Sequence, residues 1–128
     1  MWLWRKFHCL MKFPVIEIVD RYTIAVVKHE KTNGANQEEL DFYLKQMQEA
    51  KIDPLNSKVL ALIEHHDYVW SLEDDFKKAK IDALPLDQIG ARALHIRDIG
   101  YKRVDLKNAL AELVDDPVRE IKADHVSD

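Results

Sequence analysis

Residues 89–113 read IGARALHIRDIGYKRVDLKNALAEL, and apolar residues return every three or four positions along this stretch. That spacing places them on one face of an α-helix, the face expected to contact a partner helix. This face, here called the seam, consists of Ile89, Arg92, Ile96, Ile99, Arg103, Leu106, Leu110 and Leu113. The other side of the helix is polar. We expect one long helix from about Asp87 to Val114, ended by Asp116-Pro117 because proline cannot continue it.

Three further helices are predicted upstream of this stretch. The first runs from Val15 to about Lys31, where apolar positions recur at helical rather than strand spacing. Asn33-Gly34 marks a turn, and Asn36 with Glu39 predicts a capping box that opens a second helix, which ends near Ala50. Asp53-Pro54 predicts the start of a third helix, which reaches about Lys80. The pattern therefore predicts an all-α protein.

Composition limits the classes of protein that this chain can belong to. The 128 residues suit one hydrophobic core, and three glycines and four prolines are too few for an all-β fold rich in turns. The net charge of −4 disfavours nucleic acid as a partner. No segment has the length and order of a membrane anchor or signal peptide, and the single cysteine fits a reducing, cytoplasmic setting.

The positions of helix-breaking residues predict three parts: an extension or arm over residues 1–14, a bundle over residues 15–116, and a tail over residues 117–128. The expected bundle is antiparallel, with about four helices. Its two long C-terminal helices form a hairpin, and the protein is expected to be a homo-oligomer.

Two arginines interrupt the apolar seam, and this is the main functional signal in the sequence. Burying an unpaired charge is costly, so Arg92 and Arg103 each require a carboxylate, water or an anionic ligand. Glu73, among apolar neighbours on the third helix, can answer one of them. On one interpretation the pair is structural and sets helix register, as in an oligomerisation or adaptor protein. On the other, the remaining arginine binds a ligand.

The second interpretation predicts a non-catalytic module that binds a small anion such as a nucleotide or phosphosugar. Arginine forks bind phosphate and carboxylate in a bidentate manner, and aromatic rings can stack against a base or sugar. The expected site consists of Arg21, Lys28, His66, Trp70, Glu73, Arg92, Arg97, Tyr101 and Arg103. It requires no cofactor, metal or catalytic residue.

Two enzyme classes are alternatives. The sets Glu38-x-x-Asp41 and Glu64-x-x-Asp67 resemble the carboxylates of all-α nucleoside-triphosphate pyrophosphohydrolases, a resemblance that implies Mg²⁺ as a cofactor. The second enzyme class is the all-α chorismate mutases, which the chain resembles only in general style. This resemblance implies that Arg21, Lys28, Arg92 and Arg103 clamp a dicarboxylate.

Three segments resemble a pattern found in small all-α domains of unknown function from bacteria and phages. They are IVDRYTI at residues 18–24, VWSLE at residues 69–73, and RALHIRD at residues 92–98 with Lys102-Arg103 and Lys107-Asn108 beyond it. The resemblance reaches all the predicted helices but the second. It implies no activity, although in a phage setting a module of this kind would sequester a signalling nucleotide. Gly100 departs from the pattern, in which a larger polar residue is expected.

Overall fold

The computed structural model describes residues 14–77, 82–114 and 116–117. This part of the chain is all-helical, without strands, as the sequence predicts. Its helices are α2 (Val15–Lys31), α3 (Gln37–Glu49), α4 (Ser57–Lys77) and α5 (Leu86–Leu113). Apart from Pro14 and Pro117, the expected N-terminal extension and C-terminal tail lie outside the described residues.

The turn between α2 and α3 is built by Asn33 and Gly34, which have φ angles of 53° and 84°. This left-handed region favours asparagine and glycine, so the predicted turn is confirmed. The predicted capping box is wrong. The Asn36 side chain forms no cap and instead donates a hydrogen bond to the carbonyl of Ala25 on α2. Glu39 pairs with Lys28 of α2 at 3.1 Å. Both side chains therefore join α3 to α2.

The third predicted helix begins at Ser57, three residues after Pro54, which was predicted to be its first residue. The Asp53 carboxylate accepts a hydrogen bond from the Leu55 amide, which closes a local turn around Pro54. Asn56 then accepts a hydrogen bond from the Lys58 amide at 2.8 Å, and α4 begins at Ser57. Asn56 is thus the capping residue of α4. The predicted end at Lys80 lies outside the described residues.

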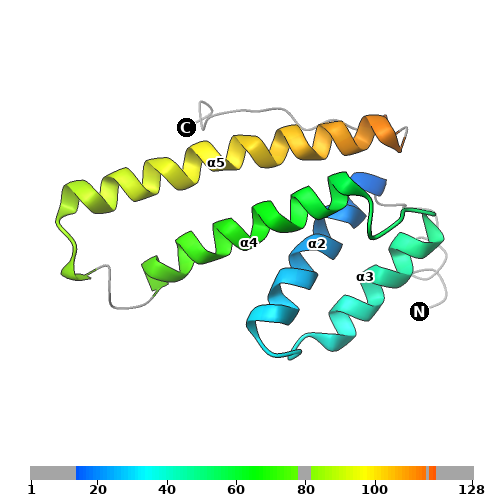
Figure 1. Cartoon of the computed structure of the whole chain (residues 1–128), viewed down its shortest axis with the longest axis horizontal. Helices are drawn as coiled ribbons and strands as arrows, with labels where there is room; N and C mark the ends of the chain where they lie inside the picture. The colour runs from blue at the N-terminus through cyan, green and yellow to red at the C-terminus, as the bar shows by residue number, and fades with distance from the viewer. Residues whose placement is uncertain (1–13, 78–81, 115, 118–128) are drawn as a thin grey trace, which may run out of the picture.

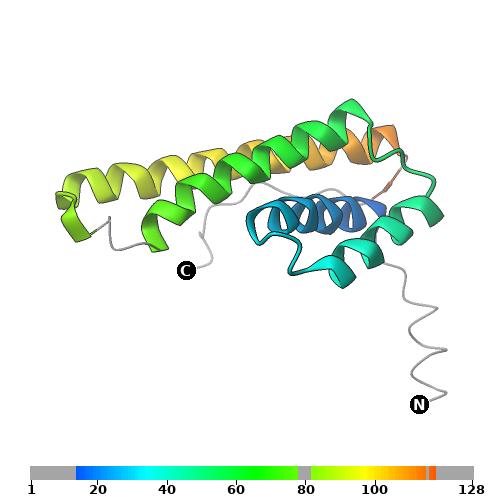
Figure 2. The same cartoon turned by 60° about the horizontal axis from the view of Figure 1, so that its bottom comes forward.

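The helices form two layers (Figures 1 and 2). One layer holds α4 and α5 side by side, and the other holds α2 with α3. The pair of long helices extends well beyond the end of α2. Within the described ranges, no helix is long and apolar enough to cross a membrane.

The hydrophobic core lies where the two layers overlap. Its buried members come from α2, the end of α3, the segment between α3 and α4, the start of α4 and the end of α5: Ile16, Val19, Tyr22, Met47, Ile52, Val59, Leu62, Leu110 and Ala111. Only some residues of the seam predicted for the last helix belong to this core. Arg92 is exposed, Ile89, Ile96 and Ile99 are half-buried, and Leu113 is 55% exposed. The buried row of α5 is instead Val104, Lys107, Leu110 and Ala111.

Candidate functional site

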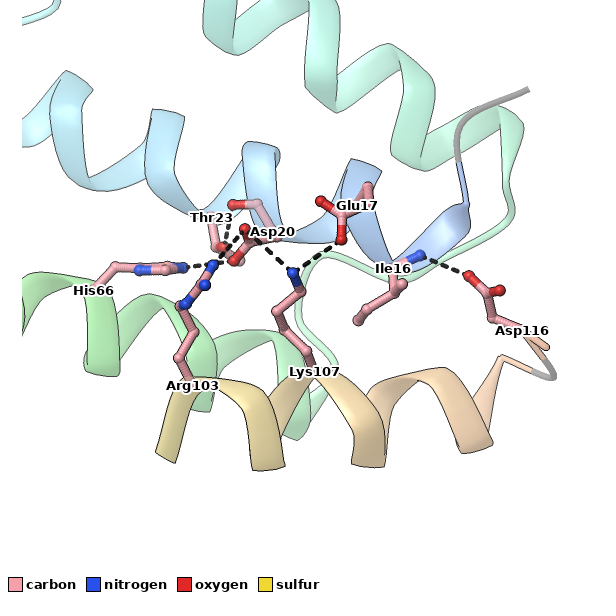
Figure 3. A network of polar contacts seen from close by, with 8 residues as sticks. All are labelled: Ile16, Glu17, Asp20, Thr23, His66, Arg103, Lys107 and Asp116. Carbon is pink, nitrogen blue, oxygen red and sulfur yellow. Dashed lines mark hydrogen bonds and ion pairs between the residues drawn. The ribbon is translucent and has the colours of Figure 1, made fainter. Parts of the chain in front are cut away.

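A buried carboxylate joins three helices at the edge of the core (Figure 3). Asp20 on α2 is 5% exposed, and its Oδ1 lies 3.0 Å from Nε2 of His66 on α4. Its Oδ2 accepts a hydrogen bond from Nη1 of Arg103 on α5 at 3.2 Å. Lys107, one turn further along α5, places its Nζ 3.8 Å from the same oxygen. We call Glu17, Asp20, His66, Arg103 and Lys107 the Asp20 network.

The charges of this network nearly balance. Lys107 is 3% exposed, and its ammonium pairs with Glu17 at 2.9 Å as well as with Asp20. Burial by itself raises the pKa of Asp20. The hydrogen bond with His66 and the charges of Lys107 and Arg103 lower the pKa, and their combined effect is larger than that of burial. The net effect is a lowered pKa, so Asp20 is ionised at neutral pH. The network has the character of a structural ion-pair cluster that fixes α2 against α4 and α5.

A second carboxylate fixes the start of α2. Asp116, 5% exposed, accepts a hydrogen bond from the Ile16 amide at 3.0 Å, as Figure 3 shows. Amides in the first turn of a helix have no partner within the helix, so a residue a hundred positions away caps α2. The contact also ties the end of α5 to the beginning of the bundle.

We expect Asp116→Ala to lower the free energy of unfolding by about 1 kcal/mol, because the Ile16 amide loses its acceptor. Urea denaturation followed by circular dichroism measures the change. Asp53→Ala is the matched control, since that carboxylate accepts a hydrogen bond only within an exposed turn. Equal stability of Asp116→Ala and the wild-type protein would mean that the buried carboxylate does not act as a cap.

Two of the nine predicted ligand-binding residues, His66 and Arg103, meet at one carboxylate. His66 and Arg103 both contact Asp20. Glu73, predicted to neutralise a seam arginine, is exposed, and the carboxylate on Arg103 is that of Asp20. For Arg103, α2 therefore supplies the carboxylate that the third helix was expected to supply, and a pair between Glu73 and Arg92 stays a prediction.

The remaining predicted residues are spread over the molecule. Arg21 donates a hydrogen bond to the Tyr43 hydroxyl at 3.4 Å, and Lys28 pairs with Glu39. Arg97 pairs with its neighbour Asp98 at the surface. Trp70 and Tyr101 are half-buried, and Arg92 is exposed. The involvement of these residues in ligand binding stays a prediction.

The carboxylate pairs of the enzyme alternative lie on two helices. Glu38 and Asp41 are on α3, where Asp41 accepts a hydrogen bond from Gln37. Glu64 and Asp67 are on α4, where Asp67 pairs with Lys31 at 2.8 Å. No group of three or more metal-ligating side chains occurs within the ranges that the structure describes.

A groove lies between α4 and α5 on a face that the sequence reasoning missed. Its volume is about 480 Å³, and none of the nine predicted residues lines it. Its lining includes His65, Tyr68, His95 and Lys102. The Tyr68 hydroxyl lies 3.1 Å from Nε2 of His95, and the two rings meet edge to face. His95 and Lys102 fall on the row of the helix that was expected to be solvated, so neither was predicted to have a functional role.

His65 is the most perturbed group in this groove. It is 6% exposed, and burial, followed by the charges of His66 and Lys102, lowers its pKa to about 4. The imidazole is therefore neutral at pH 7, with one nitrogen able to donate a hydrogen bond and the other able to accept one. Its neighbour His66 faces Asp20, so consecutive histidines on α4 serve two different faces of the helix.

Comparison with known proteins identifies no family for the chain: no family model, no curated protein and no solved structure matches it.

Proposed function

We propose that this chain is a helical self-association module, in which the far end of the α4–α5 pair docks onto the same region of a second copy. The observation that carries the proposal is the burial along α5. From Leu86 to Arg103 no side chain of α5 is buried, whereas Val104, Lys107, Leu110 and Ala111 are. Two helices alone do not enclose a core, so the exposed half of α5 requires another layer.

The exposed half of α5 carries a stripe suited to a partner helix. Continuing the row of Ala111, Lys107 and Val104 backward at helical spacing gives Gly100, Ile96, Ala93, Ile89 and Leu86, which we call the arm stripe. The side chain of Leu86 is 83% exposed. A Cβ built on Gly100 would meet no atom within 4 Å, so another helix can approach closely there. The stripe thus combines large and small residues on one face.

Charge favours a second copy as the occupant. The stretch of α4 from Glu64 to Asp74 carries four carboxylates and no lysine or arginine, while α5 from Arg92 to Lys102 carries three cations and one aspartate. In a two-fold symmetric dimer the same patch meets itself, so α4 of one copy can lie beside α5 of the other. Because α4 and α5 lie side by side in each copy, two such pairs would make a four-helix bundle.

The Asp20 network fits this proposal better than an anion-binding site. Arg103 is paired with Asp20, so the charge that motivated a ligand at the seam already has a carboxylate. A structural role for such a cluster is to set the register between helices. The network then holds α2 and α3 on one half of the long helices and leaves the other half available for association.

Mass measurement of a variant tests the proposal. We expect the wild-type chain to have about twice its monomer mass of 15.0 kDa by size-exclusion chromatography with light scattering. Leu86→Glu with Ala93→Glu should yield a monomer, because two carboxylates enter the apolar contact. Both native side chains are exposed within one chain, so the monomer fold should survive.

The matched control places the same charges on exposed leucines outside the arm stripe. Leu55 and Leu60 are 75% and 45% exposed, and Leu55→Glu with Leu60→Glu should keep the dimer mass. A wild-type monomer at high concentration would contradict the proposal. So would an arm-stripe variant that remains a dimer, or a control variant that dissociates equally.

A further inference from the structure

The groove between α4 and α5 lies on a different face from the Asp20 network. Positions next to each other in sequence divide between them: His65 and Lys102 line the groove, while His66 and Arg103 contact Asp20. Since consecutive residues on a helix point about 100° apart, neither set can serve the other face. The volume of about 480 Å³ falls within the range of small-molecule sites.

The imidazole of His65 lines the groove. This side chain belongs to a residue 6% exposed and makes a ring contact only with His66. Within the described part of the chain nothing hydrogen-bonds to this imidazole, so its donor and acceptor are available to a molecule in the groove.

The remaining lining residues define the chemistry of that molecule. Ile99 and Leu106 of α5 supply an apolar wall, and the edge-to-face rings of Tyr68 and His95 supply an aromatic end. The groove has one fixed cation, Lys102. On the α4 side are Glu64 and Asp67, of which Asp67 is paired with Lys31.

These charges favour a single negative charge over a phosphate. One lysine matches one carboxylate, whereas a phosphate dianion would bring a second charge close to Glu64. We propose that the groove binds a small monocarboxylate with a flat apolar body, whose carboxylate contacts Lys102 and the imidazole of His65. This inference is independent of self-association. It keeps the small anionic ligand expected from the sequence but places it in the groove instead of at the seam arginines.

Benzoate is a suitable probe, tested against full-length protein by two-dimensional NMR. For its nine heavy atoms we expect a Kd of about 10 mM, the order of magnitude that typical ligand efficiencies give. Saturable shifts should fall on imidazole and amide signals of His65, Tyr68, His95 and Lys102. Benzamide, of the same shape without the charge, should bind about tenfold more weakly.

Lys102→Met should weaken benzoate binding about tenfold, because the cation is lost while the exposed stem is retained. Lys58→Met is the matched control, an exposed lysine of α4 outside the groove, and should bind benzoate as the wild type does. Amide spectra confirm that each variant is folded.

Three outcomes would overturn the proposal. They are shifts that do not saturate, equal benzoate binding by Lys102→Met and the wild-type protein, and shifts that centre on residues outside the groove. Phenyl phosphate is the second probe. If it binds more tightly than benzoate, the argument for a single charge is wrong.

Discussion

Asp20→Ala is expected to lower the free energy of unfolding by about 3–5 kcal/mol, the magnitude typical of breaking a buried ion pair by removing one partner. Asp20 is the only described carboxylate that contacts His66, Arg103 and Lys107 together. Removing it takes one of two carboxylates away from the Lys107 ammonium, which is 3% exposed and also pairs with Glu17. Urea denaturation at pH 7 measures the loss.

Asp41→Ala is the control for Asp20→Ala, since Asp41 is exposed and pairs only with Gln37 on its own helix. It should change stability by less than about 0.5 kcal/mol. A loss below about 1 kcal/mol in Asp20→Ala would mean that the network does not hold α2 in place.

Replacing the whole network with apolar side chains should recover most of this loss. In Asp20→Leu, His66→Leu, Arg103→Met and Lys107→Met combined, no charge is left without a partner inside the contact. Glu17 is part-exposed and can be solvated. A combined variant as unstable as Asp20→Ala would show that the network contributes net stability beyond the register of the helices.

Mild acidification is expected to reduce the stability of the protein, because the buried His65 resists protonation in the folded state. Its pKa falls from the ordinary 6.5 to about 4 in the folded protein, through burial and then the charges of His66, Lys102 and Arg103, with Asp20 acting in the opposite direction. Between pH 6.5 and 4 the unfolded chain therefore binds a proton that the folded chain does not. Stability is complete above pH 6.5 and decreases as the pH falls to 4, by about 3 kcal/mol.

Denaturation in urea at several pH values between 7 and 4 measures this effect. His65→Gln stays neutral over the whole range, so it should lose about 3 kcal/mol less than the wild-type protein between those limits. His29→Gln is the control, because His29 contacts Gln37 at the surface. An equal acid-induced loss in wild type and His65→Gln would contradict the buried, neutral state of His65. The pKa of Asp20 is lowered in the folded protein, so Asp20 adds to the acid-induced loss of stability only near pH 4 and below, where its carboxylate becomes protonated.

Helix positions followed well from local signals, and the exceptions have local reasons. The first helix was predicted over Val15 to about Lys31, and α2 spans Val15–Lys31. Proline before it and Asn33-Gly34 after it restrict the backbone in ways that sequence reveals. The start of α4 was placed too early because Asp53-Pro54 also suits a turn, and the choice of Asn56 as cap depends on side-chain geometry.

The Asp20 network could not be predicted because its partners are far apart in sequence. Asp20 lies 46 positions from His66 and 83 from Arg103. One signal was present: Asp20 falls on the helical row of Ile16 and Thr23, which are buried. A carboxylate was one of three partners expected for each seam arginine, and Arg103 has one in Asp20, but helix spacing alone does not tell which helix supplies it.

The groove was missed for a related reason. A polar row on a helix usually faces solvent, so His95 and Lys102 were interpreted as a surface. In the structure α4 lies beside that row, and Tyr68 meets His95 across the contact. The direction of a polar face depends on where the next helix packs, which periodicity in one helix does not contain.

Amide hydrogen exchange of the wild-type protein at two concentrations reports whether a second copy covers the arm stripe. In a dimer the amides of Ile89 to Tyr101 are covered, and diluting the protein below its dissociation constant releases them. We predict that exchange in this segment accelerates on dilution, while amides of Val19 to Val27 in the core of α2 exchange at an unchanged rate. Identical exchange of residues 89–101 at both concentrations, with a monomer mass throughout, would contradict the account.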